Sequence, residues 1–402
     1  MKKQLLVLFP MLVLALVWTA CEDYSTGVDP LIDAVEDYRL SDESQVEFLV
    51  NGVLTRFATA HDVNLLLVGL LSDEMAFDPN VPNATYPTFN DINKGEITYD
   101  NNSIDGGSDN LNELRFMADD LVRRATEDIT FENEANKNEA LFWGNFFGGV
   151  ARHFLASYFG LDKTEGGGVI SESQDNLGSF IPSADMYALA LEKFDAAIAY
   201  SPDPAMTRVA KSLEGLIYLV LGDNTSAKAA FDEGMADPDD PFQSLHTTIS
   251  DNYMWQQAGH GRVQCIVPNR FQGYIDDNPQ EAARVEVDTL TGTNGVLYYY
   301  QNKYPAADSP INLMSWQVSA LLAGLADPSV ALDNANAVRT SHGIDPLESI
   351  DQAGLLVELD KEACWEGLRV ILERKFVGWH IDGGWEYLPI TQDERNINPN
   401  IN

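Results

Sequence analysis

The sequence is short of positive charge. Its 402 residues hold 25 lysines and arginines against 62 aspartates and glutamates, a formal net charge of −37 at pH 7. So acidic a surface repels nucleic acid and anionic lipid, which argues against both as partners held by charge. We attribute the acidity to solubility in a salty environment, where ions screen self-repulsion, rather than to a cationic partner.

Cysteines and catalytic motifs are also scarce. Besides Cys21 there are only Cys265 and Cys364. These two could form one disulfide in an exported protein or stay as buried free thiols, and the sequence leaves both open. It has no Gly-x-Ser-x-Gly, no His-Glu-x-x-His, no phosphate-binding loop and no Cys-x-x-Cys, and its six histidines are scattered. We therefore expect no catalytic residue, no metal site, no cofactor and no enzymatic activity.

A long apolar run stands at the N-terminus. Two lysines precede apolar residues 5–20, and Cys21 follows at once. This is the pattern of a secretory signal peptide, and the run falls short of the roughly 20 apolar residues of a membrane span. The small residues before the cysteine are similar to a bacterial lipobox, although Trp18 takes the place of the usual leucine. We expect residues 1–20 to be a lipoprotein signal peptide and Cys21 to be lipidated; an ordinary signal peptide with an incidental cysteine is the alternative.

A polar segment follows the expected lipidation site. We expect residues 21–38 to be the lipidated cysteine and a tether, and residues 39–402 to form the folded domain. Each buried CH₂ contributes about 0.8 kcal/mol, so two or more acyl chains on one residue give stable anchoring. Glu22 and Asp23 are similar to the acidic tag that directs lipoproteins of the Bacteroidetes to the outer-membrane surface.

Apolar periodicity predicts a mainly α fold. Apolar residues recur at three- and four-residue intervals through most of the domain. The segments 184–200 and 206–221 are similar in length and carry small residues where they would cross, as in tetratricopeptide repeats. We therefore expect tetratricopeptide-like helical pairs, with helical segments at 42–57, 63–71, 111–125, 138–160, 184–200, 206–221, 226–235, 312–325, 328–341 and 353–376.

Two stretches interrupt this periodicity. Residues 77–109 are polar, Asn-rich and aromatic, and predict a long loop of the kind that is usually functional or disordered. Residues 238–310 are rich in Asn, Gly, Asp and aromatics, and predict loops, short strands and brief helices. We expect this loop-rich insertion to carry a ligand site, because binding residues concentrate on loops held by a rigid scaffold.

Several segments match the pattern of a known family in chain order. The most specific is Tyr-Leu-Pro-Ile-Thr-Gln-Asp-Glu at 387–394, followed by Asn-Pro-Asn at 398–400. Others lie at 139–160, 187–198, 221–223, 334–343 and 359–369. Together they resemble the SusD/RagB family of nutrient-binding outer-membrane lipoproteins over nearly all of the mature chain.

The resemblance implies a role rather than a reaction. Such proteins sit on the extracellular face of the outer membrane as a lid on a SusC-type TonB-dependent transporter, to which they deliver an oligosaccharide or a peptide. Two alternatives are a lipid-anchored helical-repeat scaffold for protein–protein interaction and a surface hydrolase. The lack of catalytic motifs disfavours the hydrolase, and the aromatic-rich segment 251–316 favours ligand capture over a plain scaffold.

Aromatic side chains are the best candidates for a binding site, because a flat ring can stack on the apolar C–H face of a sugar. Trp143, Phe146 and Trp365 lie on predicted helical faces and are expected in the core. Glu366 and Arg369 are expected to be structural, as an ion pair or a helix cap. The candidate ligand-binding residues, which lie in or beside irregular segments, are Tyr86, Tyr253, Trp255, Tyr274, Tyr304 and Trp316, with Arg270 and Arg284 as polar partners.

Overall fold

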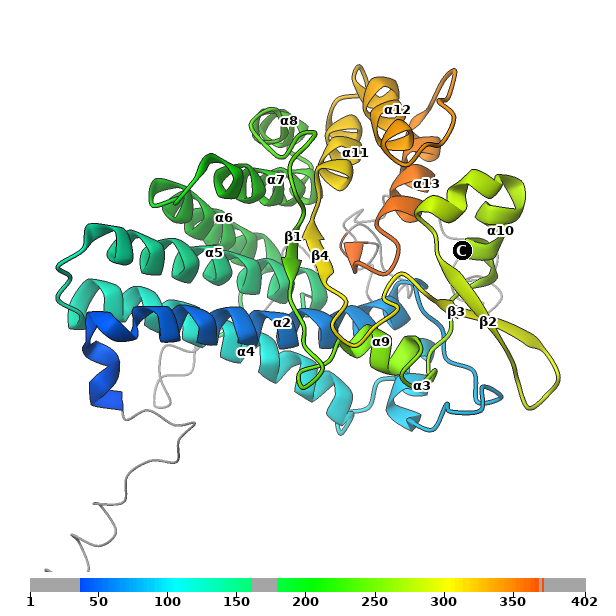
Figure 1. Ribbon diagram of the computed structural model, residues 1–402, viewed down its shortest axis with the longest axis horizontal. Coiled ribbons are helices and arrows are strands. Elements are labelled where there is room, and N and C mark those ends of the chain that lie inside the picture. Colours follow the sequence, from blue (N-terminus) through cyan, green and yellow to red (C-terminus); the bar gives the residue numbers. More distant parts are fainter. Residues whose placement is uncertain (1–36, 161–178, 369–370, 372–402) are drawn as a thin grey trace, which may run out of the picture.

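The computed structural model describes residues 37–160, 179–368 and 371 (Figure 1). Cys21, the expected signal peptide, Arg369 and the run at 387–394 lie outside the described residues. Within the described part helices dominate and strands are short, which confirms the mainly α fold. No helix in this part is both long and apolar enough to cross a membrane.

Three long helices pack side by side (Figure 1): α2 (Val46–Leu71), α4 (Asn102–Arg123) and α5 (Glu134–Tyr158). Helix α2 continues through residues 58–62, where the sequence predicted two separate segments. The buried Ala58 and Ala60 are good helix formers, and no glycine or proline interrupts this stretch. Shorter elements flank the three helices: η1 (Asp37–Ser41), η2 (Glu43–Gln45), α3 (Pro87–Lys94) and the π-helical turn η3 (Arg124–Asp128).

Helical pairs continue from α5. Helix α6 (Ser183–Ala199) packs against α5 and α7 (Pro204–Leu221), and α7 packs against α8 (Asn224–Asp232). Asp203 caps α7 by accepting hydrogen bonds from the backbone N–H groups of Ala205 and Met206. Gly222 ends it at φ +81°, which glycine adopts without a Cβ clash. This stack confirms the tetratricopeptide-like arrangement.

The stack is extended by α11 (Trp316–Ala326), which packs against α7 and α8 and against α12 (Ala331–Ser341) and α13 (Gln352–Glu362). The prediction of a helix from residue 312 was wrong. Residues Ile311–Met314 form strand β4, which pairs antiparallel with β1 (Phe242–Ser244). The helix begins only after Ser315, whose side chain caps it by accepting from the N–H of Val318.

The prediction that the last helix runs to residue 376 was also wrong. Helix α13 ends at Glu362, and residues 363–367 form turns. Trp365 and Gly367 have φ values of +60° and +72°, which no α-helix can contain.

Residues 238–310 confirm the predicted mixture of loops, short strands and brief helices. They contain α9 (Tyr253–Ala258), α10 (Asn269–Asp277), the 3₁₀ helix η4 (Pro279–Ala283) and an antiparallel hairpin of β2 (Val287–Thr291) and β3 (Leu297–Gln301). Isolated bridges join Ala76 to Ile266 and Val267 to Tyr299. The region is therefore tied both to its own hairpin and to the segment after α2.

The prediction of one long loop at 77–109 was wrong, because α3 lies within this stretch and α4 already begins at Asn102. Asn101 starts the helix by accepting from the N–H groups of Ser103 and Ile104. A Cβ on Gly107 would lie 2.7 Å from Leu67 Cδ1 and 2.9 Å from Asn64 Oδ1, both on α2. The glycine that lowers helix propensity thus permits the close approach of two helices, and packing outweighs propensity.

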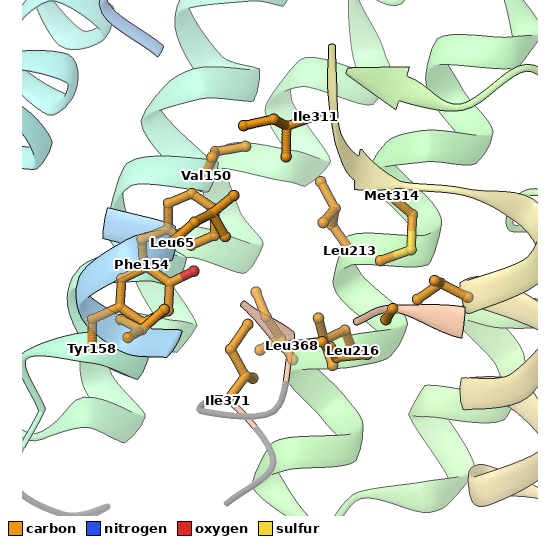
Figure 2. Close-up of a cluster of buried hydrophobic side chains, with 14 of the residues drawn as sticks. Leu65, Val150, Phe154, Tyr158, Leu213, Leu216, Ile311, Met314, Leu368 and Ile371 are labelled. Carbon is orange, nitrogen blue, oxygen red and sulfur yellow. The ribbon is translucent and has the colours of Figure 1, made fainter. Parts of the chain in front are cut away.

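The core joins the helical pairs to the C-terminal segment, as Figure 2 shows. Side chains from α2 and α5 lie on one side of the cluster, side chains from α7 and β4 lie on the other, and those that follow α13 lie between them. All are buried, and each apolar side chain of this size stabilises the fold by about 1.5–3 kcal/mol. They include Leu65, Phe154, Tyr158, Leu213, Leu216, Met314, Leu368 and Ile371.

The structure decides between the two possibilities for the cysteines. Cys265 and Cys364 are both buried free thiols, so they form no disulfide with each other. Burial raises the pKa of the Cys364 thiol to about 12, which keeps it protonated and unreactive.

Candidate functional site

A cavity of about 540 Å³ opens between α2, α3, α4 and α9. These elements come from two distant parts of the sequence, 46–123 and 253–258, and α3 and α9 lie near the N-terminal end of α4 in Figure 1. The wall brings together two residues of the predicted site, Tyr86 and Tyr253. The other lining residues are Val63, Leu67, Pro87, Thr88, Phe89, Asn102, Ser103, Gly106 and Asn110.

Tyr86 forms the exposed aromatic part of the wall. Its side chain is 37% exposed, and its ring meets the buried ring of Phe89 edge-on at 5.2 Å. The guanidinium of Arg262 lies 5.3 Å from the Tyr86 ring centroid and donates to Thr85 Oγ1 at 2.6 Å. Gln264 Oε1 accepts from the backbone N–H of Thr85 at 3.2 Å. The irregular region thus holds the segment that carries Tyr86 in place.

Hydroxyl and amide groups form the polar part of the wall. The Thr88 and Ser103 hydroxyls lie 2.8 Å apart and share one hydrogen bond. Asn101 Nδ2 donates to the Thr88 carbonyl at 3.1 Å, which ties α3 to the start of α4. Arg56 Nη1 donates to Asn110 Oδ1 at 2.9 Å. The Asn110 oxygen is therefore occupied, and its NH₂ group can donate to a ligand.

Tyr253 is placed by a buried acid. Asp62 Oδ2 of α2 accepts from the Tyr253 backbone N–H at 2.9 Å, and Asn252 caps α9 by accepting from the Trp255 N–H. Burial raises the pKa of Asp62 to about 8, so this carboxyl is largely uncharged at neutral pH. His246 Nδ1 lies 3.5 Å from the same oxygen, and burial lowers the pKa of His246 to about 4.

Ser244, His246 and Asp62 lie in the order of a hydrolase triad. Ser244 Oγ is 3.3 Å from His246 Nε2, and His246 Nδ1 faces Asp62. Ser244 is 1% exposed, however, so a substrate cannot reach it. A triad also needs a charged acid and a histidine that takes up a proton near neutral pH, and the two pKa values above are shifted the opposite way. The arrangement of Ser244, His246 and Asp62 therefore does not support a hydrolase.

The buried acid leads to a pH prediction. Asp62 is expected to make stability fall as pH rises from 6.5 to 8, because the folded state keeps a proton that the unfolded carboxyl, with its ordinary pKa of 3.8, has lost. Burial also lowers the pKa values of His61 and His153 to about 3, so these two histidines and His246 raise stability with pH until their unfolded imidazoles, with an ordinary pKa of 6.5, have lost their protons about one pH unit above that value. One proton over 1.5 pH units corresponds to about 2 kcal/mol.

Asp62→Asn keeps an oxygen for the Tyr253 N–H and cannot titrate. Urea unfolding at pH 6.5, 7.2 and 8 should show that Asp62→Asn gains stability relative to the wild type as pH rises, because both proteins share the histidine contribution and only the wild type has the opposing contribution of Asp62. A pH-independent effect of the substitution on the free energy of unfolding does not alter the result, because only the slopes of stability against pH are compared. Equal slopes would contradict a protonated Asp62.

The other predicted aromatic residues lie elsewhere. Trp255 is half-buried, with its ring against Gly261. The Tyr274 hydroxyl donates to Asp360 Oδ2 at 2.8 Å. Tyr304 is 2% exposed, and its hydroxyl donates to the Trp365 carbonyl at 3.1 Å. Trp316 is 8% exposed and lines a different cavity of about 370 Å³. None of the four lines the cavity of Tyr86 and Tyr253.

The two candidate arginines take part in internal ion pairs. Arg270 Nε lies 2.9 Å from Asp360 Oδ2, and its Nη1 lies 3.3 Å from Asp73 Oδ2. Arg284 is buried and pairs with Glu281 at 2.8 Å and Glu358 at 2.5 Å. Both arginines join the irregular region to neighbouring elements, α13 among them.

Four residues that were expected to be structural are so. Phe146 and Trp365 are buried, and Trp143 is half-buried and packs on the core. Glu366 forms an ion pair with Lys303 at 2.8 Å, as expected of a structural residue.

Sequence reasoning missed the polar half of the site. Thr88, Asn102, Ser103 and Asn110 all lie in or at the edge of the stretch that was expected to be a loop. The signal was the density of Asn and Ser just before the predicted helix at 111. With Asn101 recognised as a cap, Asn102, Ser103 and Asn110 would have been placed on the first turns of one helix, whereas Thr88 lies on the separate helix α3.

Comparison with solved structures identifies the fold. A SusD superfamily protein from Bacteroides thetaiotaomicron is 13% identical, with a TM-score of 0.70 over 89% of this chain and 93% of that one. Surface glycan-binding protein A from Bacteroides uniformis has a TM-score of 0.59 at 13% identity, over 89% and 98% of the two chains. This chain has the SusD fold. A third structure with this fold, a crystal structure with xylogluco-oligosaccharide, has a TM-score of 0.62 at 12% identity, over 80% of both chains.

Two comparisons at the level of sequence found no match. No family model matches the sequence. No curated protein matches it either.

Proposed function

We propose that the chain is a non-enzymatic surface glycan-binding protein that captures an oligosaccharide in the cavity between α2, α3, α4 and α9. The observation that carries the proposal is the combination of an exposed aromatic ring with hydroxyl and amide groups in one open cavity. Tyr86 offers a face for the C–H groups of a sugar, while Asn110 and the Thr88–Ser103 pair can bond its hydroxyls. Solved proteins with the SusD fold include a surface glycan-binding protein and a structure with an oligosaccharide, which supports this choice over a peptide ligand.

The proposal includes a place in the cell. Cys21 carries the lipid anchor, residues 21–38 form the tether, and residues 39–402 form one binding domain on the extracellular side of the outer membrane. There the domain delivers its ligand to a SusC-like TonB-dependent transporter. This part rests on the N-terminal sequence pattern and on the family resemblance of the sequence.

Tyr86→Ala is expected to weaken glycan binding at least tenfold, about 1.4 kcal/mol, because it removes the stacking surface and leaves the rest of the wall intact. Isothermal calorimetry against a panel of oligosaccharides measures the change. Tyr200→Ala is a matched control, because Tyr200 at the end of α6 is 38% exposed and lies outside the cavity wall. Equal affinity for both variants would remove Tyr86 from the site, and no binding of any oligosaccharide by the wild type would overturn glycan capture.

The anchor and the transporter need separate experiments. Mass spectrometry of the mature N-terminus should find an acylated Cys21, and Cys21→Ser should release the protein from membranes. Purification from detergent-solubilised outer membrane should bring down a TonB-dependent barrel with the wild type. If the protein binds glycans but purifies without a barrel, glycan capture is retained and delivery to a transporter is refuted.

A further inference from the structure

The cavity wall lacks charge. Its eleven lining residues include no Asp, Glu, Lys, Arg or His. The protein as a whole has 22% charged residues and a net charge of −37. An open cavity without any charged side chain therefore contrasts with the rest of the surface, and its chemistry sets which ligand it can hold.

Three ionisable groups beside the wall, Arg56, Arg262 and Asp62, have contacts outside the lining. Arg56 Nη1, which reaches Asn110, also pairs with Glu113 at 2.7 Å, so its charge is balanced by a carboxylate. Arg262 lies over the ring of Tyr86 and donates to Thr85. Asp62, behind Tyr253, is buried and largely uncharged. Arg262 has no carboxylate partner among the described residues, but it is held over the Tyr86 ring and by Thr85 and is not a lining residue, so the lining itself offers no cation to bind a carboxylate or a sulfate.

The polar groups of the wall suit hydroxyls better than anions. The Thr88 and Ser103 hydroxyls share one hydrogen bond, so one O–H and several lone pairs are left. The pair can therefore donate one hydrogen bond to a ligand and accept others, as a sugar hydroxyl also does. An anionic group only accepts, and its transfer from water into a wall without a cation costs far more than the transfer of a hydroxyl.

We propose that the ligand is a neutral oligosaccharide and that acidic glycans, with uronate or sulfate groups, are excluded from this cavity. The inference rests on the proposed glycan capture and adds the chemical class of the glycan. Two effects act in the same direction: the uncharged wall fails to bind an anion, and the net charge of −37 repels it before contact.

The test compares each neutral oligosaccharide with its own oxidised form. The full chain in detergent is titrated with cello-, manno-, laminari- and xylogluco-oligosaccharides, and each ligand that binds is then tested after oxidation of its primary alcohols to carboxylates. We expect Tyr86-dependent binding of a neutral ligand and at least a tenfold loss for its oxidised form. The loss should persist in 0.5 M NaCl, where the Debye length is about 4 Å and long-range repulsion is screened. A loss that disappears in salt would refute the role of the wall.

A variant with a charge added to the wall tests whether the uncharged lining causes the exclusion of acidic glycans. Asn102 lines the cavity, is exposed and has no side-chain hydrogen bond among the described residues, so Asn102→Lys adds a cation with little structural cost. Asn102→Lys should reduce the ratio of the affinities for the neutral and the oxidised ligand at least threefold. Asn102→Gln should leave this ratio unchanged. If the wild type binds an acidic glycan as tightly as its neutral form, and this binding depends on Tyr86, the restriction to neutral glycans is refuted. The proposed glycan capture would remain. No Tyr86-dependent binding of any glycan would overturn both.

Discussion

Replacing Lys303 with Met is expected to lower the free energy of unfolding by about 3 kcal/mol. The Lys303 ammonium pairs with Glu366 Oε1 at 2.8 Å and donates to the backbone carbonyls of Glu362 and Cys364 at 3.1 and 3.3 Å. Burial opposes its charge, but the Glu366 carboxylate outweighs that effect and holds the pKa of Lys303 well above its usual value. The Glu366 side chain is 7% exposed, so loss of the lysine leaves a carboxylate with little water.

A second variant separates the ion pair from simple packing. In Lys303→Met with Glu366→Gln neither of the two positions carries a charge, and the Gln oxygen can still accept from Asn312 Nδ2, which donates to Glu366 at 2.9 Å in the wild type. Urea unfolding should show that the double variant recovers most of the loss. A double variant as unstable as Lys303→Met would mean that the lysine acts through its backbone contacts and not through the charge pair.

Local sequence carries most of the information about the helical pairs, but it does not predict exact helix ends. Residues 184–200 and 206–221 were predicted within a few residues, because their apolar stripes and the Asp203 and Gly222 caps are local signals. The start of α4 was missed, because Gly107 lowers helix propensity and its benefit comes from contact with Asn64 and Leu67, about 40 residues away. Likewise β4 forms only because β1, about 70 residues earlier, pairs with it.

The candidate site was only partly predictable for the same reason. Tyr86 and Tyr304 both lie beside irregular segments, and nothing local distinguishes them. Tyr304 is buried because residues around Trp365 cover it, whereas Tyr86 lies 37% exposed at the edge of the cavity. Burial of an aromatic residue depends on segments far away in the sequence, so sequence can propose candidates but cannot rank them.

Trp365→Ala is expected to cost about 3–5 kcal/mol of stability, the largest effect of a single substitution that we predict. Trp365 is 1% exposed, packs on Phe271 with ring centroids 4.9 Å apart, and donates from Nε1 to the Glu74 carbonyl at 3.0 Å. Its backbone N–H also donates to Glu74 Oε1 at 3.2 Å. Removal of the indole therefore leaves a cavity and takes one hydrogen-bond donor away from the Glu74 carbonyl.

Trp365→Phe separates these two costs. Phenylalanine fills much of the space but cannot donate to the Glu74 carbonyl, so it should lose less than half as much stability as alanine. The backbone φ of +60° is equally unfavourable for tryptophan, phenylalanine and alanine, so it does not enter the comparison. Urea unfolding followed by circular dichroism gives the values, and glycan affinity at low urea should be unchanged, because Trp365 does not line the cavity. A loss below 1 kcal/mol for Trp365→Ala would show that the segment after α13 contributes little to the fold, contrary to its buried position between the helical pairs.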